Sequence, residues 1–178
     1  RKSVTAFNLP SVELINYEAD DLIATYSEQI LEKGAKVTIV SSDKDLMQLY
    51  KKDVRLYDPM KNKFITLKDV IDKFGVDPKK VIDVQSLAGD SSDNVPGVPG
   101  IGIKIAAELI NKYDTLEKLF DKAHEIKQNK RRETIIENKE KAIISKKLVT
   151  LKKDVPIKEK IEKFRFKEID KDKLYNYL

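Results

Sequence analysis

The chain has 178 residues, a length that suits one domain or one and a half small ones. Charged residues make up 37% and hydrophobic residues 40%, so the sequence can form a core beneath a densely charged surface. It has no Cys and one His, His124, which excludes a disulfide framework, a Cys/His zinc site and a cysteine nucleophile. No apolar run approaches the roughly 18 residues that span a bilayer, and no signal peptide opens the chain. We therefore expect a cytoplasmic protein with no membrane partner.

The net charge of +5 is divided unevenly along the chain. Residues 1–100 carry 14 basic and 16 acidic side chains, and residues 101–178 carry 21 and 14. An acidic half joined to a basic half suits a cation site beside a surface that binds a polyanion. A solvated surface rich in Lys explains the same numbers, so the charge alone leaves nucleic-acid binding open.

The first half of the chain predicts an α/β fold. After a short strand or loop over residues 1–17, apolar side chains recur at helical spacing over residues 22–31, with a stop at Gly34. A β-branched run then predicts a buried, central parallel strand, and a short helix follows it. The predicted strands cover residues 36–41, 54–57 and, more weakly, 63–66. Strand, helix and strand in this order favour an α/β sheet.

Beyond Leu67 the pattern is helical. The predicted helices cover residues 67–74, 78–87, 103–113 and 116–126, followed by a heavily charged stretch over 131–153. The loop from Gly89 to Gly102 carries four of the six glycines. We therefore divide the chain into a sheet-containing part, residues 1–75, and an all-helical part, residues 76–178.

Three short segments concentrate acidic side chains. Each has a local explanation: complementing a helix dipole, capping a helix N-terminus, or bonding its own turn. Together they hold seven carboxylates, and two like charges 4 Å apart cost about 4 kcal/mol at an effective dielectric constant of 20. Divalent cations would relieve this repulsion, and an all-oxygen ligand set selects Mg²⁺ or Mn²⁺ over zinc. The acids are Glu18, Asp20, Asp21, Asp43, Asp45, Asp90 and Asp93.

The glycine-rich segment 95–107 is the most specific feature. Gly100 and Gly102 let the backbone approach an anion, and a helix that starts near Ile103 directs its free N–H groups the same way. Lys104 adds positive charge, while Ile101 and Ile105 can anchor the turn. Such a turn between two helices grips a DNA phosphate backbone without reading bases, although an ordinary Pro-Gly loop is the alternative.

Three motifs in this order resemble the 5'-nuclease (flap endonuclease) superfamily, above all the 5'→3' exonuclease domain of bacterial DNA polymerase I. They are Tyr-Glu-Ala-Asp-Asp at 17–21, Ser-Asp-Lys-Asp-Leu-Met-Gln-Leu at 42–49, and Leu-Ala-Gly-Asp-Ser-Ser-Asp-Asn-Val-Pro-Gly-Val-Pro-Gly-Ile-Gly-Ile-Lys at 87–104. The resemblance covers essentially the whole chain. It implies a partial parallel sheet of the PIN/5'-nuclease type, followed by a helical subdomain with a helix–hairpin–helix at about 78–113.

The resemblance also implies a site and an activity. All seven acids match the family's metal ligands, with Asp43, Asp45, Asp90 and Asp93 as the catalytic group and two ions as the expected number. The duplex, and a K⁺ ion bound through backbone carbonyls, would contact Gly97, Val98, Gly100, Ile101, Gly102 and Lys104. The family cleaves 5' flaps and primers on branched or nicked DNA in replication and repair, here beside a polymerase domain in the parent protein.

The sequence departs from the family in two places. No segment matches the family's first Asp-bearing strand, its second Asp and its basic helical arch. We therefore expect missing metal ligands, exposed sheet edges or apolar patches, and weak or no cleavage by this chain. Ile103 stands where the family more often has a polar residue or Pro. A non-catalytic DNA-binding module and a PIN-type ribonuclease are the alternatives, and the hairpin argues against the second.

Overall fold

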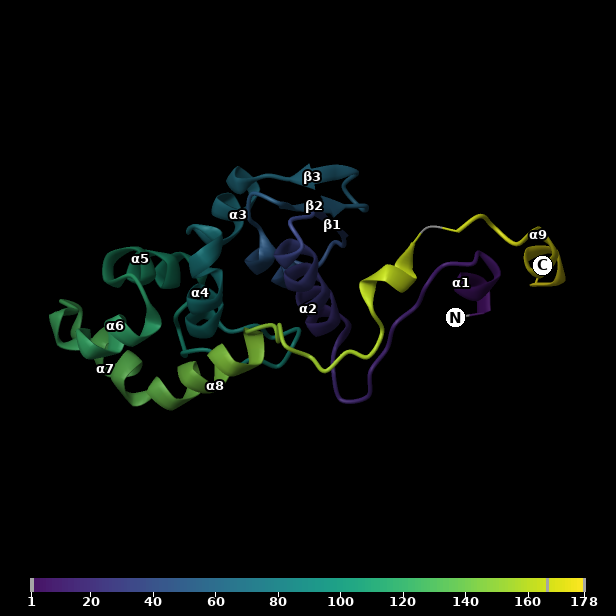
Figure 1. Ribbon diagram of the computed structural model, residues 1–178. Coiled ribbons are helices and arrows are strands. Elements are labelled where there is room, and N and C mark those ends of the chain that lie inside the picture. Colours follow the sequence, from purple (N-terminus) through teal and green to yellow (C-terminus); the bar gives the residue numbers. More distant parts are fainter. Residues whose placement is uncertain (1, 166, 178) are drawn as a thin grey trace. The chain divides into compact units, whose positions relative to one another are not determined.

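The structure, a computed structural model, describes residues 2–165 and 167–177. They form two compact units (Figure 1). One unit combines the residues up to Ala35 with those from Lys152 onward, and the other runs from Lys36 to Leu151. No described helix is long and apolar enough to cross a membrane.

The second unit contains a three-stranded sheet of β1 (Val37–Val40), β2 (Val54–Asp58) and β3 (Lys63–Ile65), in that spatial order. Strands β1 and β2 are parallel, as predicted, whereas β2 and β3 are antiparallel. The short turn between β2 and β3 explains this direction, because a parallel neighbour needs a crossover of about a dozen residues or more. The sheet is therefore mixed.

Strand β1 is buried on one face only, so the prediction of a buried, central strand holds for that one face and not for its central position. Val37 and Ile39 are buried, whereas Val40 is 63% exposed, and β1 lies at the edge of the described sheet. On the exposed face Val40 lies opposite Tyr57, which lies opposite Phe64. This apolar row agrees with the exposed patches expected from the resemblance.

The rest of this unit is helical and is organised around α4 (Val81–Ala88), which follows a 3-10 helix at Pro78–Lys80. Helix α4 packs against both α5 (Ile103–Tyr113) and α8 (Lys139–Val149), and Val81, Val84 and Leu87 on it are fully buried. The remaining α-helices described in this unit are α3 (Leu67–Phe74), α6 (Leu116–Asp121) and α7 (Asn129–Glu137). Helix α4 is thus held between two other helices, and the loop that follows it starts from a fixed position.

The first unit contains α1 (Lys2–Ala6), α2 (Ala19–Glu32) and α9 (Lys171–Tyr177). The prediction of a strand or loop at the start of the chain is wrong for Lys2–Ala6, which is helical. This helix contacts α9, and just beyond it the Asn8 side chain donates to the backbone oxygen of Glu168 at 3.0 Å. The partner lies at the far end of the sequence, so local patterning could not reveal it.

Candidate metal centre and phosphate-binding hairpin

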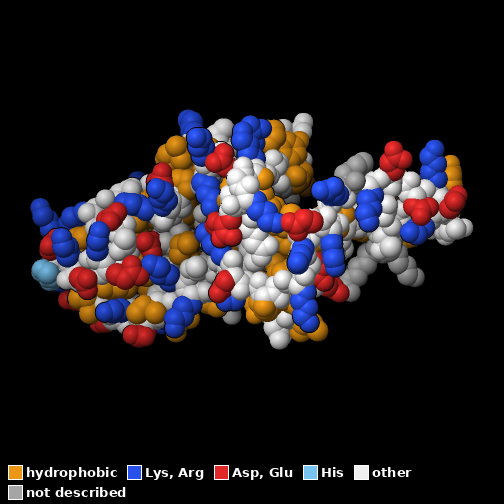
Figure 2. All heavy atoms as spheres, in the orientation of Figure 1, with side chains coloured by type: hydrophobic (Ala, Val, Ile, Leu, Met, Phe, Trp, Pro, Cys, Tyr) orange, Lys and Arg blue, Asp and Glu red, His pale blue; other side chains and the backbone are white. Residues whose placement is uncertain are grey.

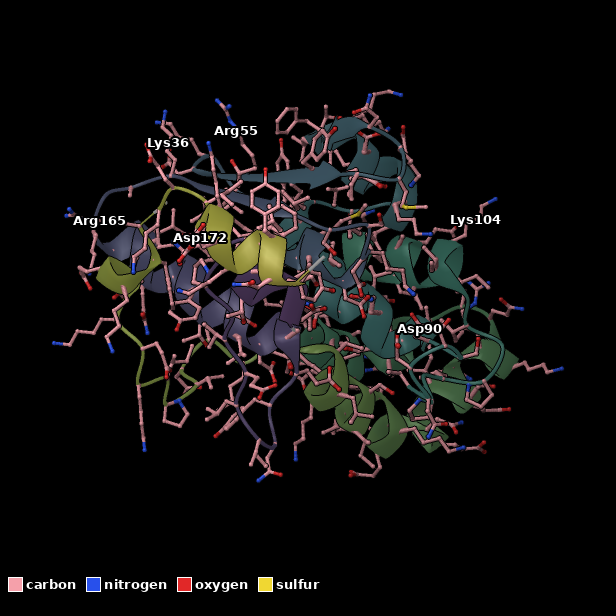
Figure 3. The ribbon with its side chains drawn as sticks, turned by 90° about the vertical axis from the view of Figure 1, so that its right-hand side faces the viewer. Lys36, Arg55, Asp90, Lys104, Arg165 and Asp172 are labelled. Atoms are coloured by element: carbon pink, nitrogen blue, oxygen red, sulfur yellow. The ribbon has the colours of Figure 1, made fainter. Side chains whose placement is uncertain are left out.

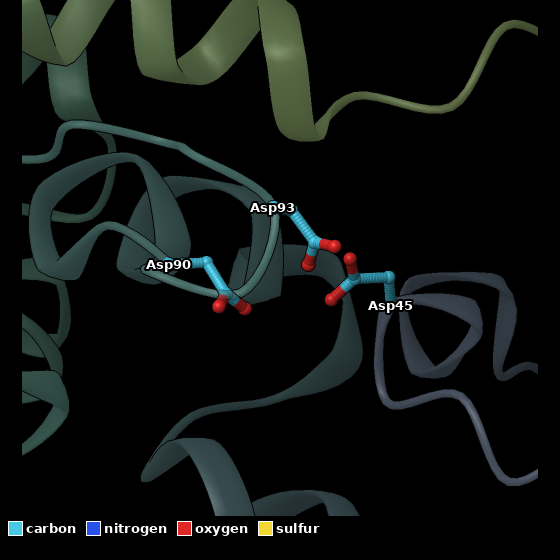
Figure 4. A group of neighbouring side chains, drawn as sticks. All are labelled: Asp45, Asp90 and Asp93. Carbon is cyan, nitrogen blue, oxygen red and sulfur yellow. The ribbon is translucent and has the colours of Figure 1, made fainter.

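Three of the predicted acids converge in the second unit (Figure 4). Asp45 begins a 3-10 helix, Asp45–Leu49, shortly after β1, while Asp90 and Asp93 lie on the loop after α4. One carboxylate oxygen from each lies within 4.8 Å of the others. We call these three residues the acidic cluster.

The loop that carries Asp90 and Asp93 is closed by backbone contacts. Asp90 and Val95 exchange two backbone hydrogen bonds, of 2.9 and 2.8 Å. Gly89 and Gly97 lie back to back with φ of +71° and +58°, and a Cβ on Gly97 would lie 2.4 Å from the Gly89 nitrogen. Gly97 also donates its N–H to Ser145 Oγ on α8 at 2.9 Å. Only glycine fits at position 97, and the loop holds the two carboxylates in place.

Two neighbouring side chains, Lys44 and Gln85, contact the acidic cluster. The Lys44 ammonium forms an ion pair with Asp90, and this contact holds the pKa of Asp90 below its usual value. Gln85, on α4, donates from Nε2 to Asp45 Oδ1 at 2.6 Å. Burial raises the pKa of Asp45 despite this hydrogen bond, and the nearby Asp43 carboxylate adds to the increase. A cation at the cluster would favour the ionised form of Asp45.

The geometry of the acidic cluster fits a hard divalent cation. Oxygen ligands bind Mg²⁺ and Ca²⁺ at about 2.0–2.6 Å, so two ligands of one ion lie at most about 4–5 Å apart. The separations within 4.8 Å lie inside the limit for Ca²⁺, and the carboxylates would draw together by a few tenths of an ångström around the smaller Mg²⁺. All three donors are carboxylates, the ligand type that such ions prefer.

The other four predicted acids lie outside this cluster. Asp43 is exposed, and its Oδ1 accepts the backbone N–H of Asp45 at 2.9 Å. This is a local turn contact and not the predicted alternative of a helix N-cap, because Lys44 is the N-cap of the following 3-10 helix. Glu18 precedes α2 and Asp20 and Asp21 lie in its first turn, in the other compact unit. Asp21 Oδ1 accepts the backbone N–H of Lys152 at 2.8 Å. Convergence is observed for three acids and stays a prediction for the rest.

The hairpin between α4 and α5 presents open backbone. Val98 donates to the Leu87 oxygen at 2.7 Å, and the buried side chains of Val98 and Ile101 anchor the turn. At Gly100, with φ of +74°, and at Gly102, no described atom lies within 4 Å of where a Cβ would stand. The predicted anchoring by Ile101 is confirmed.

Helix α5 begins directly after this opening. The first N–H groups of a helix have no partner within it, and Ala106 is the first α5 residue whose N–H reaches Gly102 O, at 2.9 Å. Lys104 projects away from the ribbon (Figure 3). This end of α5 therefore offers N–H donors and one cation to an anion.

Sequence reasoning missed two residues of this site, Lys44 and Gln85. Lys44 stands between two acids of a motif, a placement that favours an internal ion pair. Gln85 is one of three buried polar residues on α4, with Asp83 and Ser86, and is only 3% exposed. A buried amide needs hydrogen-bond partners, and this requirement was the available signal.

Comparisons with known proteins agree with this architecture. The family model "5'-3' exonuclease, N-terminal resolvase-like domain" matches residues 1–75, and "5'-3' exonuclease, C-terminal SAM fold" matches residues 76–172. The chain belongs to the 5'-3' exonuclease family. The expected fold class, an α/β sheet followed by a helical part, is confirmed, with the sheet mixed rather than parallel.

Relatives of this exonuclease-family chain include longer proteins. It is 56% identical over 157 residues to DNA polymerase I of Rhizobium leguminosarum, covering 88% of this chain and 16% of that protein. It is 40% identical over 166 residues to the 5'-3' exonuclease of Aquifex aeolicus, covering 93% and 56%. The flap endonuclease of bacteriophage T5, solved with DNA and metal ions, shares the fold with a TM-score of 0.76 at 23% identity, covering 84% and 55%. The chain thus spans about half of the exonuclease relative.

Proposed function

We propose that this chain provides metal-dependent phosphodiester hydrolysis on branched or nicked DNA, as a 5'→3' exonuclease or flap endonuclease. The observation that carries the proposal is the acidic cluster of Asp45, Asp90 and Asp93, whose carboxylate oxygens lie within 4.8 Å of one another. Its fit to a hard cation supports Mg²⁺ or Mn²⁺ as the cofactor. The DNA polymerase I relatives extend far beyond the matched segment, and we propose that the chain acts beside a polymerase domain.

The chain's own residues have distinct roles in this proposal. Asp45, Asp90 and Asp93 would hold one cation, and we assign Glu18, Asp20, Asp21 and Asp43 to complete a two-ion site. When bound, two such ions would supply an activated water and stabilise the leaving oxygen. Lys44 neutralises part of the cluster's charge, and Gln85 fixes one oxygen of Asp45.

The hairpin would hold the duplex by its phosphates. The open backbone at Gly100 and Gly102, the free N–H groups at the start of α5, and Lys104 offer contacts to the sugar–phosphate chain without reading bases. Backbone carbonyls of the segment Gly97–Lys104 are the proposed ligands of a K⁺ ion. Figure 2 shows basic side chains interspersed with acidic ones on the face drawn, so an oriented hairpin explains DNA binding better than a uniform basic patch there.

A cleavage assay tests the proposal. A 5'-flap duplex labelled at its 5' end is incubated with excess chain in Mn²⁺ or Mg²⁺, beside chains carrying Asp90→Asn or Asp93→Asn. We expect slow release of the flap that needs a divalent cation and is lost in both variants. Equal release by wild type and variants, or neither binding nor release of the flap by wild type, would contradict the proposal.

A non-catalytic duplex-binding module is the second candidate, and the exposed hairpin favours it. Binding dominated by phosphate contacts weakens steeply with salt. Fluorescence anisotropy of a labelled duplex should show weaker binding by Lys104→Ala and a salt slope smaller by about one unit. Metal-independent binding without cleavage in the flap assay would favour this candidate over the nuclease.

A further inference from the structure

Gln85 joins the core of the helical part to the acidic cluster. It lies on α4 between the fully buried Val84 and Leu87 and is itself 3% exposed. Its Nε2 donates to Asp45 Oδ1 at 2.6 Å. A buried side chain therefore fixes one oxygen of a proposed metal ligand.

The other half of the amide lacks a partner. Gln85 Oε1 is buried and accepts no hydrogen bond from residues 2–165 or 167–177. Since the oxygen and nitrogen of one amide are less than about 2.6 Å apart, Oε1 lies within about 5 Å of Asp45 Oδ1. An unsatisfied buried acceptor costs stability unless another group satisfies it. The acceptor therefore lies close to one carboxylate of the acidic cluster, and a water of a hydrated cation would be a donor for it.

We propose that Gln85 is a positioning residue of the metal centre. It orients the Asp45 carboxylate through Nε2, and its Oε1 accepts a hydrogen bond from the hydration shell of the bound cation. The inference rests on the proposed function, because it assumes that the acidic cluster binds a divalent cation. Mg²⁺ usually keeps several waters when it binds to protein. Replacing a residue that hydrogen-bonds to a metal ligand, without binding the metal itself, changes metal affinity about 10–100-fold.

Gln48 provides a matched control. Its amide also makes two hydrogen bonds, from Nε2 to Val149 O at 2.9 Å and from Leu151 N to Oε1 at 3.2 Å. Both partners are backbone groups outside the acidic cluster. Gln48→Leu therefore removes the same chemical group without removing a hydrogen bond to Asp45.

The test is calorimetric titration of Mn²⁺ into the metal-free chain and three variants: Gln85→Leu, Gln85→Met and Gln48→Leu. Circular dichroism first establishes that each variant is folded, and the unbranched Met variant guards against a packing failure of Leu. We expect Kd for Mn²⁺ to rise about tenfold or more in both Gln85 variants and to stay within about twofold of wild type in Gln48→Leu.

The outcomes separate the inference from the proposed function. Wild-type affinity in the folded Gln85 variants would overturn the positioning role while leaving the metal centre intact. An equal loss in Gln48→Leu would also overturn it, because the effect would then be one of general stability. Absence of Mn²⁺ binding by the wild-type chain would overturn both the inference and the proposed centre.

Discussion

Removing the charge of Lys44 should tighten binding of a divalent cation. The Lys44 ammonium is paired with Asp90, and the two side chains are 32% and 10% exposed. Lys44→Met keeps an unbranched side chain and removes the positive charge. An incoming cation then no longer competes with an internal ion pair for Asp90, and the positive charge that would repel it is gone.

The magnitude follows from Coulomb's law with a correction for solvent. A unit charge 4 Å from another contributes about 4 kcal/mol at an effective dielectric constant of 20. Because Lys44 is about one-third exposed, solvent screening reduces the usable part to about 1–2 kcal/mol. Each 1.4 kcal/mol is about a tenfold change in Kd. We therefore expect Lys44→Met to bind Mn²⁺ roughly tenfold more tightly and to unfold more easily when metal-free.

Isothermal titration calorimetry measures this change, and Lys80→Met is its control. Lys80 pairs with Asp114 at 2.8 Å and is 28% exposed, similar to Lys44, but it lies outside the acidic cluster. The control should leave Mn²⁺ affinity unchanged, and Lys44→Arg should behave like wild type. Equal or weaker Mn²⁺ binding by Lys44→Met would refute the idea that this ion pair opposes metal binding.

Two further substitutions test the loop and the surface charges. Gly97→Ala should lower the free energy of unfolding by about 2–4 kcal/mol in urea, because left-handed strain of about 1–2 kcal/mol adds to a backbone overlap at 2.4 Å. Gly100→Ala has a similar φ but open space around the new Cβ, so its free energy of unfolding should fall only by the strain of about 1–2 kcal/mol. Equal losses in the two variants would contradict a contribution from the backbone overlap at Gly97. Lys118 and Lys80 hold the pKa of Asp114 at about 2, so its stabilisation is present above about pH 4 and disappears as pH falls through about 2. Asp114→Asn tolerates the φ of +79°, and its stability deficit in urea should therefore shrink below pH 4; a deficit independent of pH would exclude this ion pair as the cause.

The elements that the sequence predicts best are those with local punctuation. Helix α5 covers Ile103–Tyr113 as predicted, since an apolar stripe and a preceding glycine define it. Helix α3 has a capping box between Thr66 and Asp69 and ends at Gly75 in the left-handed conformation. These signals act within a few residues and do not depend on tertiary contacts.

The sequence predictions fail where contacts between distant parts of the chain determine the local structure or burial. Helix α1 packs against α9 at the other end of the sequence, and the one-sided burial of β1 depends on its place at the sheet edge. The motifs that carry the acidic cluster were visible in the sequence. The sequence did not show which acids join the cluster and which make local contacts. Asp43 serves a local turn, while Lys44 and Gln85 engage Asp90 and Asp45 only once the chain has folded.

Binding of Mn²⁺ followed by electron paramagnetic resonance tests the central claim most directly. Free Mn²⁺ gives a strong signal that weakens on binding, so the number and affinity of sites can be read for wild type and for a chain with Asp45, Asp90 and Asp93 all changed to Asn. We predict at least one bound ion in wild type and its loss in the triple variant. Retention of the same ion by the triple variant, or no binding by wild type, would contradict the assignment of these carboxylates as a metal centre.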